Sequence, residues 1–217
     1  MKKTGKSISY YPVFLNLRGK RCVVAGGGNV ALRKVQSLLD CGADIQIIGS
    51  RVCAGLSSLA GTGKLSVNRK KYEKGDLDGA FAAIAATGDH ALNRRIAMEA
   101  REKRVLVNVV DDPAACDFIV PSIMRRGDIA IAVSTGGSSP ALARKLRSRL
   151  ESEFGEEYAA ISDLISEVRL ELRDKGIKAA ADKWQEAIDL DSLAGLLKKG
   201  STAQAKALLK QKLLGIE

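Results

Sequence analysis

Short apolar runs alternate with longer, helix-patterned stretches along the first half of the chain. Between the runs, apolar residues recur at helical spacing, most clearly over residues 30–40 and 91–103. Strands that alternate with helices in this way predict a parallel sheet with helices on both faces, a doubly wound, Rossmann-like α/β fold. The runs that we expect to form its strands are residues 21–25, 44–48, 64–68, 80–87 and 105–110.

The pattern changes after Pro113. Two β-rich runs follow, over residues 118–124 and 129–134, and they flank the segment Arg125-Arg126-Gly127-Asp128. Two such runs around a short segment with glycine and aspartate are typical of a β-hairpin.

Helices are expected from the end of this hairpin onward. Ser139 is a good N-cap and Pro140 a good first residue for a helix over residues 141–154. The chain from residue 156 to 214 is polar and helical, with breaks at Gly176 and Lys199-Gly200. We therefore predict a dinucleotide-binding Rossmann-like domain, a β-plus-helix connecting segment and a small all-α domain, over residues 1–117, 118–154 and 155–217.

Three glycines stand where the first predicted strand gives way to a helix. Gly26, Gly28 and Ala31 match the G-x-G-x-x-G/A spacing of dinucleotide-binding folds. The first glycine permits the tight turn, the second lets backbone N–H groups approach a pyrophosphate, and the small third residue lets the helix pack on its strand. Phosphates would then lie at the helix N-terminus, where the dipole favours anions. The competing interpretation is a plain structural strand–turn–helix unit.

The end of the second predicted strand lacks the acidic residue that such folds use to hold the adenine ribose. It reads Ile47-Ile48-Gly49-Ser50-Arg51. Arg51 would favour a 2′-phosphate, which leaves NADP open beside NAD, or it is an ordinary solvated charge at a strand end. The small residues over 81–86 end at Thr87-Gly88, where a cofactor would cross the carboxyl edge of the sheet.

Two further segments hold residues suited to chemistry. Asp111 ends the last parallel strand, where it would accept a proton or contact a metal ion; the alternative is an aspartate that only forms a turn. Residues 136–140, Gly-Gly-Ser-Ser-Pro, would bind a carboxylate or phosphate through their N–H groups, or else form a tight turn. Arg144 and Arg147 would add charge-assisted contacts to carboxylates, unless they lie on a solvated helix face.

Composition and charge narrow the class of protein. The chain has 217 residues, of which 46% are hydrophobic and 28% charged, as expected of a globular protein. No apolar run approaches the roughly 18 residues that span a bilayer, and residues 1–6 lack an apolar signal core. The four cysteines form no C-x-x-C pair and His90 has no ligand partners nearby, so we expect a cytoplasmic protein with reduced cysteines. The net charge of +10 suits a polyanionic partner, but only 4% of residues are aromatic and the basic residues are dispersed, which argues against nucleic acid.

Several segments together resemble one known family. Over roughly residues 8–155 the chain is similar to the precorrin-2 dehydrogenase / sirohydrochlorin ferrochelatase family, which includes the N-terminal module of siroheme synthase. The similarity is specific because independent motifs occur in one order. They are residues 11–17 (Tyr-Pro-Val-Phe-Leu-Asn-Leu), 26–34, 85–89 (Ala-Ala-Thr-Gly-Asp), 108–113 (Asn-Val-Val-Asp-Asp-Pro), 118–123 and 132–143.

This resemblance implies an NAD-dependent oxidation of precorrin-2 to sirohydrochlorin, a step towards sirohaem, with Asp111 as the general base. Some relatives then insert Fe²⁺ at the same site, with Asp111 as a transient metal contact, and the motifs do not separate the two kinds of member. The residues implied to bind NAD are Gly26, Gly28, Asn29, Val30, Ala31, Ser50, Arg51, Ala86 and Thr87. Those implied to bind the polyanionic tetrapyrrole are Asn108, Ser134, Gly136, Gly137, Ser138 and Arg144.

The resemblance also implies a homodimer, formed through the segment 118–154. Two positions depart from the family pattern: many relatives have an acid where Arg51 stands, and Thr135 occupies a position that is often a regulatory serine. The alternative function is an NAD-sensing regulatory module whose basic helical tail is the output surface. Such a sensor needs the glycine loop but no acid at the position of Asp111.

Overall fold

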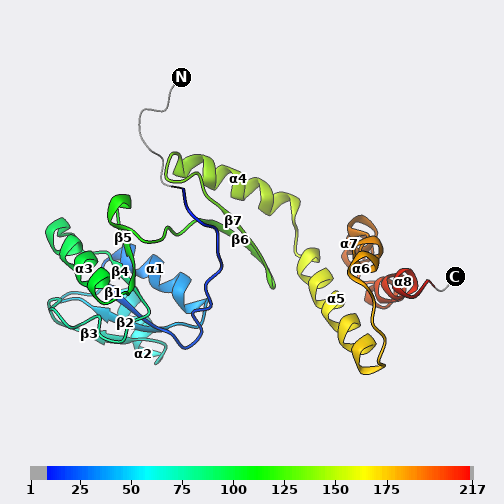
Figure 1. Cartoon of the computed structure of the whole chain (residues 1–217), viewed down its shortest axis with the longest axis horizontal. Coiled ribbons are helices and arrows are strands. Elements are labelled where there is room, and N and C mark those ends of the chain that lie inside the picture. The colour runs from blue at the N-terminus through cyan, green and yellow to red at the C-terminus, as the bar shows by residue number, and fades with distance from the viewer. Residues whose placement is uncertain (1–8, 216–217) are drawn as a thin grey trace, which may run out of the picture. The chain divides into compact units, whose positions relative to one another are not determined.

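The computed structural model describes residues 9–215 (Figure 1). The chain divides into two compact units, Met1–Val120 and Pro121–Glu217, and each is considered by itself. Residues 1–6, on which the expectation about a signal segment rests, lie outside the described residues. The further division of the second unit near residue 154 stays a prediction.

The first unit is built on a five-stranded parallel sheet with the strand order β3-β2-β1-β4-β5. The chain starts in the middle of the sheet, moves outward to β3, and then returns to the other side of β1. Ligands of open α/β sheets bind where the strand order reverses, here between β1 and β4. The prediction of a doubly wound sheet is confirmed, with strands β1 (Arg21–Ala25), β2 (Asp44–Ile48), β3 (Ser66–Asn68), β4 (Ala82–Ala85) and β5 (Leu106–Val109).

Helices cover both faces of this sheet (Figure 1). Successive residues of a strand point to opposite faces, so Val23 belongs to one buried cluster with Ile96 of α3. Val24 belongs to the other cluster, with Val35 of α1 and Leu56 of α2. Both faces are therefore dry, which is the normal state of a parallel sheet. The helices are α1 (Asn29–Leu39), α2 (Ala54–Gly61) and α3 (His90–Glu102).

The two largest differences between the first unit and the sequence-based expectation concern α2 and β4; β3 and β5 are also one or two residues shorter at an end than expected. The hydrophobic pattern does not predict α2, because this short helix has glycines at both ends of its sequence and only one buried residue, Leu56. The strand expected over residues 80–87 shortens to β4, since Ala80 donates its N–H to Leu77 O in a turn and Thr87 bonds to Asn93.

The second unit begins with the predicted hairpin, formed by β6 (Ser122–Arg126) and β7 (Ile129–Val133). Its first strand starts later than expected, directly after Pro121, which has no N–H for a ladder. The Ser139 hydroxyl accepts a hydrogen bond from Leu142 N at 3.3 Å, which confirms the predicted cap, and Pro140 is the first residue of α4 (Pro140–Glu153).

Four helices complete the second unit. Their core contains Leu164 and Val168 of α5 together with Leu193 of α7 and Leu209 of α8. The expected breaks at Gly176 and at Lys199-Gly200 are confirmed, and one more break precedes α7. Over residues 9–215, no helix has the length and apolar character needed to cross a bilayer. The helices are α5 (Glu157–Asp174), α6 (Ala181–Ala187), α7 (Leu190–Lys198) and α8 (Thr202–Leu214).

Candidate functional site

A pocket of about 520 Å³ opens at the carboxyl edge of the parallel sheet. The connections that follow the four neighbouring strands β3, β2, β1 and β4 line it, and so does the start of α3. The structure therefore brings together Gly26, Gly28, Ser50, Arg51, Ala86 and Thr87, which the sequence predicts as nucleotide contacts. Asn29, Val30 and Ala31 do not line the pocket; they form the first turn of α1, and Ala31 is buried beneath it.

The three glycines of the loop differ in whether the fold has room for a side chain in their place. Gly26 has φ +125°, and a Cβ atom on it would overlap the carbonyl oxygen of Ala86. A Cβ atom on Gly27 would overlap the carbonyl oxygen of Arg51, whereas one on Gly28 would meet nothing within 4 Å. The fold thus requires the first two glycines, while Gly28 leaves space in front of the pocket.

The N-terminus of α1 is open towards this space. Gly28 is its N-cap residue, and no side chain caps the helix. The first N–H groups of an α-helix have no partner within it and favour anions. The loop and α1 consequently fit the pyrophosphate of a dinucleotide, as the sequence predicts.

A buried asparagine that the sequence analysis missed holds the next wall of the pocket. Asn93 of α3 is 2% exposed. Its Oδ1 accepts from the hydroxyl of Thr87 at 2.7 Å, and its Nδ2 donates to Thr87 O at 3.1 Å. An asparagine on the apolar side of a predicted helix is the signal that points to it, because a buried amide needs partners.

Basic residues from separate parts of the chain also line the pocket. They are Arg51, Lys70, Lys71 and Arg95, of which the sequence analysis named Arg51 alone. Lys70 forms ion pairs with Asp76 at 2.8 Å and Glu73 at 3.0 Å, whose hydrogen bonds raise its pKa. The other three are exposed.

Asp111 lies just beyond β5, at the same edge of the sheet but outside the lining of this pocket. It is exposed and has φ +60°, in the left-handed region that few non-glycine residues adopt. The thiol of Cys116 stabilises this turn. Its Sγ accepts a hydrogen bond from Val109 N at 3.1 Å. As a donor, the thiol has two acceptors in reach, Val109 O at 3.2 Å and Asp112 O at 3.3 Å. Asp111 is therefore presented to solvent on a fixed turn.

Asn108 and Lys34 also lie near the turn that holds Asp111. Asn108 is 6% exposed, and its Nδ2 donates to Phe118 O at 3.0 Å, so its amide positions the segment after β5. Burial lowers the pKa of Lys34 on α1, while the nearby thiol of Cys116 and the carboxylate of Asp111 act in the opposite direction. No sequence motif indicates that Cys116 and Lys34 lie beside Asp111, since their places depend on the fold.

The remaining predicted substrate contacts lie in the second unit. Ser134, Gly136, Gly137 and Ser138 form the connection from β7 to α4, and Arg144 is exposed on α4. Part of the loop is satisfied internally, because Gly136 N donates to Ser134 Oγ at 3.1 Å and Ser138 N donates to Thr135 O at 3.1 Å. That these residues and Asp111 bind the same substrate stays a prediction.

Two family models match this chain. The family described as "Putative NAD(P)-binding" matches residues 13–122, and the one described as "Sirohaem biosynthesis protein central" matches residues 126–153. The chain belongs to the NAD(P)-binding family. All the residues that line the pocket at the sheet edge lie within the part of the chain that this family model matches.

Siroheme synthases are among the proteins that are similar to this NAD(P)-binding chain. It is 36% identical over 210 residues to siroheme synthase of Nitrosococcus oceani, covering 96% of this chain and 45% of that protein. It is 37% identical over 204 residues to siroheme synthase of Methylococcus capsulatus, covering 93% of this chain and 43% of the relative. The chain therefore spans less than half the length of these relatives.

A solved structure matches most of the length of the chain. It is SirC, precorrin-2 dehydrogenase, with a TM-score of 0.70 and 26% sequence identity, covering 94% of this chain and 98% of that one. The predicted fold, including the helical part after the hairpin, is confirmed by this match.

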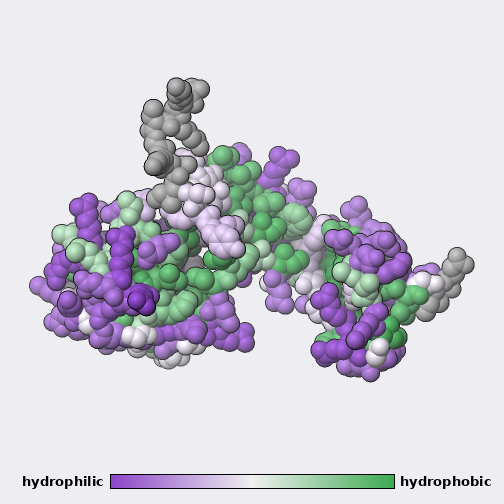
Figure 2. Space-filling view, in the orientation of Figure 1, coloured by the Kyte–Doolittle hydropathy of each residue, from purple (hydrophilic) through white to green (hydrophobic). Residues whose placement is uncertain are grey.

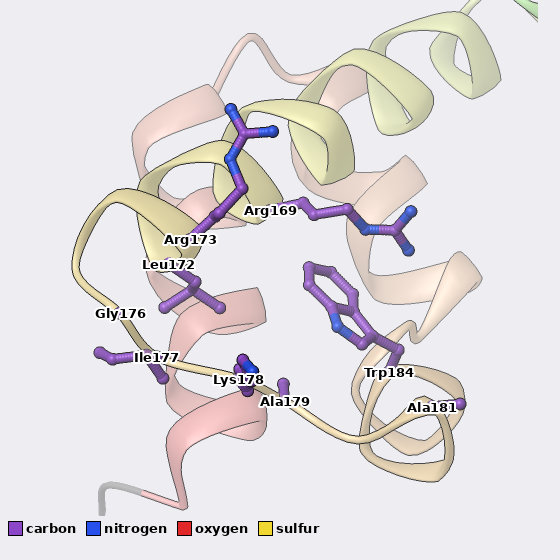
Figure 3. Close-up of a pocket in the computed structure, with 9 residues that line it drawn as sticks. All are labelled: Arg169, Leu172, Arg173, Gly176, Ile177, Lys178, Ala179, Ala181 and Trp184. Carbon is purple, nitrogen blue, oxygen red and sulfur yellow. The ribbon is translucent and has the colours of Figure 1, made fainter.

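The helical part of the chain has a separate hollow of about 610 Å³ (Figure 3). The guanidinium of Arg169 lies 5.0 Å from the ring centre of Trp184, and Leu172 and Ile177 line the opposite side. This hollow has no counterpart among the sites predicted from the sequence. Among the described residues, no group of three or more His, Cys, Asp or Glu is arranged to hold a metal ion.

Proposed function

We propose that this chain oxidises precorrin-2 to sirohydrochlorin, a step in sirohaem synthesis, with a nicotinamide dinucleotide as the hydride acceptor. The observation that supports this most strongly is the open glycine-loop pocket in a chain that matches SirC, precorrin-2 dehydrogenase, over nearly its whole length. The names of the siroheme synthases point to the same pathway product.

The residues of the pocket fit a dinucleotide. Gly28 leaves room for the pyrophosphate, and the uncapped N-terminus of α1 offers N–H groups to it. The connection after β4, fixed by Asn93, also lines the pocket. When bound there, the nicotinamide supplies the acceptor for the hydride; the resemblance names NAD for this role.

The oxidation removes two hydrogens from the substrate, one with its electron pair and the other as a proton. Asp111 is suited to take the proton, because its carboxylate is exposed and its turn is fixed by Cys116. Substrate carboxylates would be held by the N–H groups and hydroxyls around Gly137 and by Arg144. Asn108 would act by fixing the turn that holds Asp111, since its amide already bonds to Phe118 O.

Insertion of Fe²⁺ into sirohydrochlorin is a second activity that the name of the siroheme synthases favours. The iron would be a substrate, and Asp111 would accept the pyrrole protons and contact the ion in passing. Anaerobic incubation of the protein with sirohydrochlorin and Fe²⁺, without dinucleotide, tests this directly. Sirohaem formation no faster than without protein would contradict it.

We also propose that the chain forms a homodimer through residues 118–154. Supporting this, α4 buries only Ala143 within the unit, while Leu142 and Leu146 are 50% and 42% exposed. Figure 2 shows apolar surface along α4 and the hairpin. An apolar face of this kind on a surface helix is typical of an association site.

The test of the main proposal is an anaerobic assay with precorrin-2 and either dinucleotide. We expect the absorbance of the reduced nucleotide and of sirohydrochlorin to rise together, in equal amounts. Dinucleotide binding without any turnover would instead support the alternative, a regulatory module that senses the nucleotide.

A further inference from the structure

We propose that the adenosine end of this pocket recognises a 2′-phosphate, so that the chain binds NADP more tightly than NAD. This inference rests on the proposed dinucleotide site and goes further by naming the form of the nucleotide. Its basis is the set of charges that surround the end of β2.

No acid stands where the ribose 2′-hydroxyl of NAD would need one. The segment after β2 reads Gly49-Ser50-Arg51, whereas NAD sites have an Asp or Glu there that accepts from the hydroxyl. The acid that does line the pocket, Asp89, already accepts from Ala91 N at 2.9 Å and Leu92 N at 3.1 Å as the cap of α3.

The fold holds Arg51 beside the phosphate loop. Gly27 is packed directly against the carbonyl group of Arg51, and Cys53 N donates to Gly27 O at 2.8 Å. The backbone that carries the guanidinium is thus fastened to the loop that receives the pyrophosphate. The 2′ position of the adenine ribose lies next to this junction in Rossmann-type sites.

A second cation comes from the neighbouring strand. Asn68 O, at the end of β3, accepts from Gly49 N at 3.1 Å and from Lys70 N at 2.9 Å, which ties the ends of β2 and β3 together. Lys71 follows directly and lines the same pocket. Lys70 is neutralised by Asp76 and Glu73, but within residues 9–215 neither Arg51 nor Lys71 has an ion-pair partner.

These charges favour the phosphorylated nucleotide for a chemical reason. Arginine and lysine side chains only donate hydrogen bonds, so they offer no acceptor to a 2′-hydroxyl. A phosphate monoester carries a charge of about −1.5 to −2 at neutral pH, and a guanidinium can bind two of its oxygens at once. Arg95, which lines the pocket from α3, adds to the positive potential.

Calorimetric titration of the full chain with NAD and with NADP tests the inference without any turnover. We expect the Kd for NADP to be lower by about tenfold or more, as one or two charge-assisted hydrogen bonds would give. Arg51→Ser should raise the Kd for NADP much more than the Kd for NAD and so remove most of this difference, and Lys71→Ser should remove part of it. Arg18→Ser, which removes an exposed arginine at the amino edge of the sheet, is the matched control and should keep the full difference.

The outcomes separate the two proposals. Equal or tighter binding of NAD, or an equal loss for both nucleotides in Arg51→Ser, overturns the preference for NADP and leaves the dehydrogenase proposal standing. Failure of both nucleotides to bind overturns the proposed dinucleotide site itself.

Discussion

Asp111 combines an exposed carboxylate with a backbone conformation that costs an ordinary residue free energy. Its φ of +60° suits glycine, asparagine and aspartate best. The hydrogen bonds of Cys116 to Val109 and Asp112 hold the turn in place. Backbone strain that the surrounding structure maintains is frequent at functional sites.

Substitutions of Asp111 distinguish its proposed role as proton acceptor from its role in the structure of the turn. Asp111→Asn keeps the shape and the tolerance for this φ, so we expect unchanged thermal stability and dinucleotide binding with oxidation reduced by about 100-fold or more, because the proton acceptor is gone. Turnover is measured as reduced nucleotide formed under anaerobic conditions.

Two companion variants interpret this result. Asp112→Asn removes the neighbouring carboxylate, which pairs with Arg94 at 3.6 Å, and should keep near-normal turnover. Asp111→Ala should also lose stability, because alanine disfavours a positive φ. Full activity in Asp111→Asn would exclude this carboxylate as the base.

The glycines of the loop make a second prediction at the residue scale. Gly28→Ala should fold normally, because its Cβ meets open space, while Gly28→Asp should fold but lose nucleotide binding through bulk and negative charge at the pyrophosphate. Gly27→Ala should destabilise the protein by about 1–3 kcal/mol or more, because its Cβ overlaps the Arg51 carbonyl oxygen. Thermal melts and calorimetric titration measure the two effects, and retained binding in Gly28→Asp would contradict our placement of the phosphates.

At the scale of elements, ion pairs connect the first and last helices of the helical part. Glu171 on α5 bonds to Lys206 and Lys210 on α8, and Lys206 also reaches Glu167 at 2.6 Å. The hydrogen bonds from Lys206 and then Lys210 lower the pKa of Glu171 from its ordinary value of 4.5 to about 2.

This shift predicts how the stability of the helical part depends on pH. A carboxyl group whose pKa is lowered by folding stabilises the folded state above its ordinary pKa, and this contribution disappears as the pH falls towards the folded-state value. We expect the contact between α5 and α8 to weaken from about pH 4.5 down to about pH 2. In thermal melts followed by circular dichroism, the melting temperature of Glu171→Gln should fall less over this pH range than that of the parent protein. The melting temperature of Glu153→Gln, a change on α4, should fall as much as that of the parent protein.

The sequence predicted elements best where periodicity was strong. The bounds of β1 and β2 agree with the expected runs, and α1 and α3 differ from theirs by one residue at each end. The pattern failed for α2, whose glycines and single buried leucine resemble a loop. The pattern also predicted a longer strand than β4, because apolar residues continue into the turns that flank this strand.

The whole molecule shows why part of the site could not be foreseen. The glycine loop, Arg51 and Asp111 each follow a strand, so the rule that parallel strands end at one edge places them from sequence alone. Lys71 and Arg95 join Arg51 in the lining of the glycine-loop pocket because of the strand order and the position of α3. Cys116 and Asn93 act through hydrogen bonds that depend on local backbone geometry, which periodicity does not reveal.

Association of the chain is the prediction that belongs to this scale. Light scattering should give twice the chain mass of 23.1 kDa, and a Leu142→Glu, Leu146→Glu double variant should give the single mass, because two charges would enter an apolar interface. Leu170→Glu, at a leucine that is 48% exposed on α5, is the matched control and should stay dimeric. A parent protein of single mass would contradict the dimer.

Trp184, which lies under the guanidinium of Arg169, is the one indole of the chain. Excited at the red edge of its absorption, where tyrosine does not absorb, its fluorescence reports on the C-terminal helices alone. Emission that shifts when NADP is titrated in would mean that occupancy at the sheet edge is communicated to the helices. A constant spectrum would show two halves that respond independently, and a single cuvette distinguishes the cases.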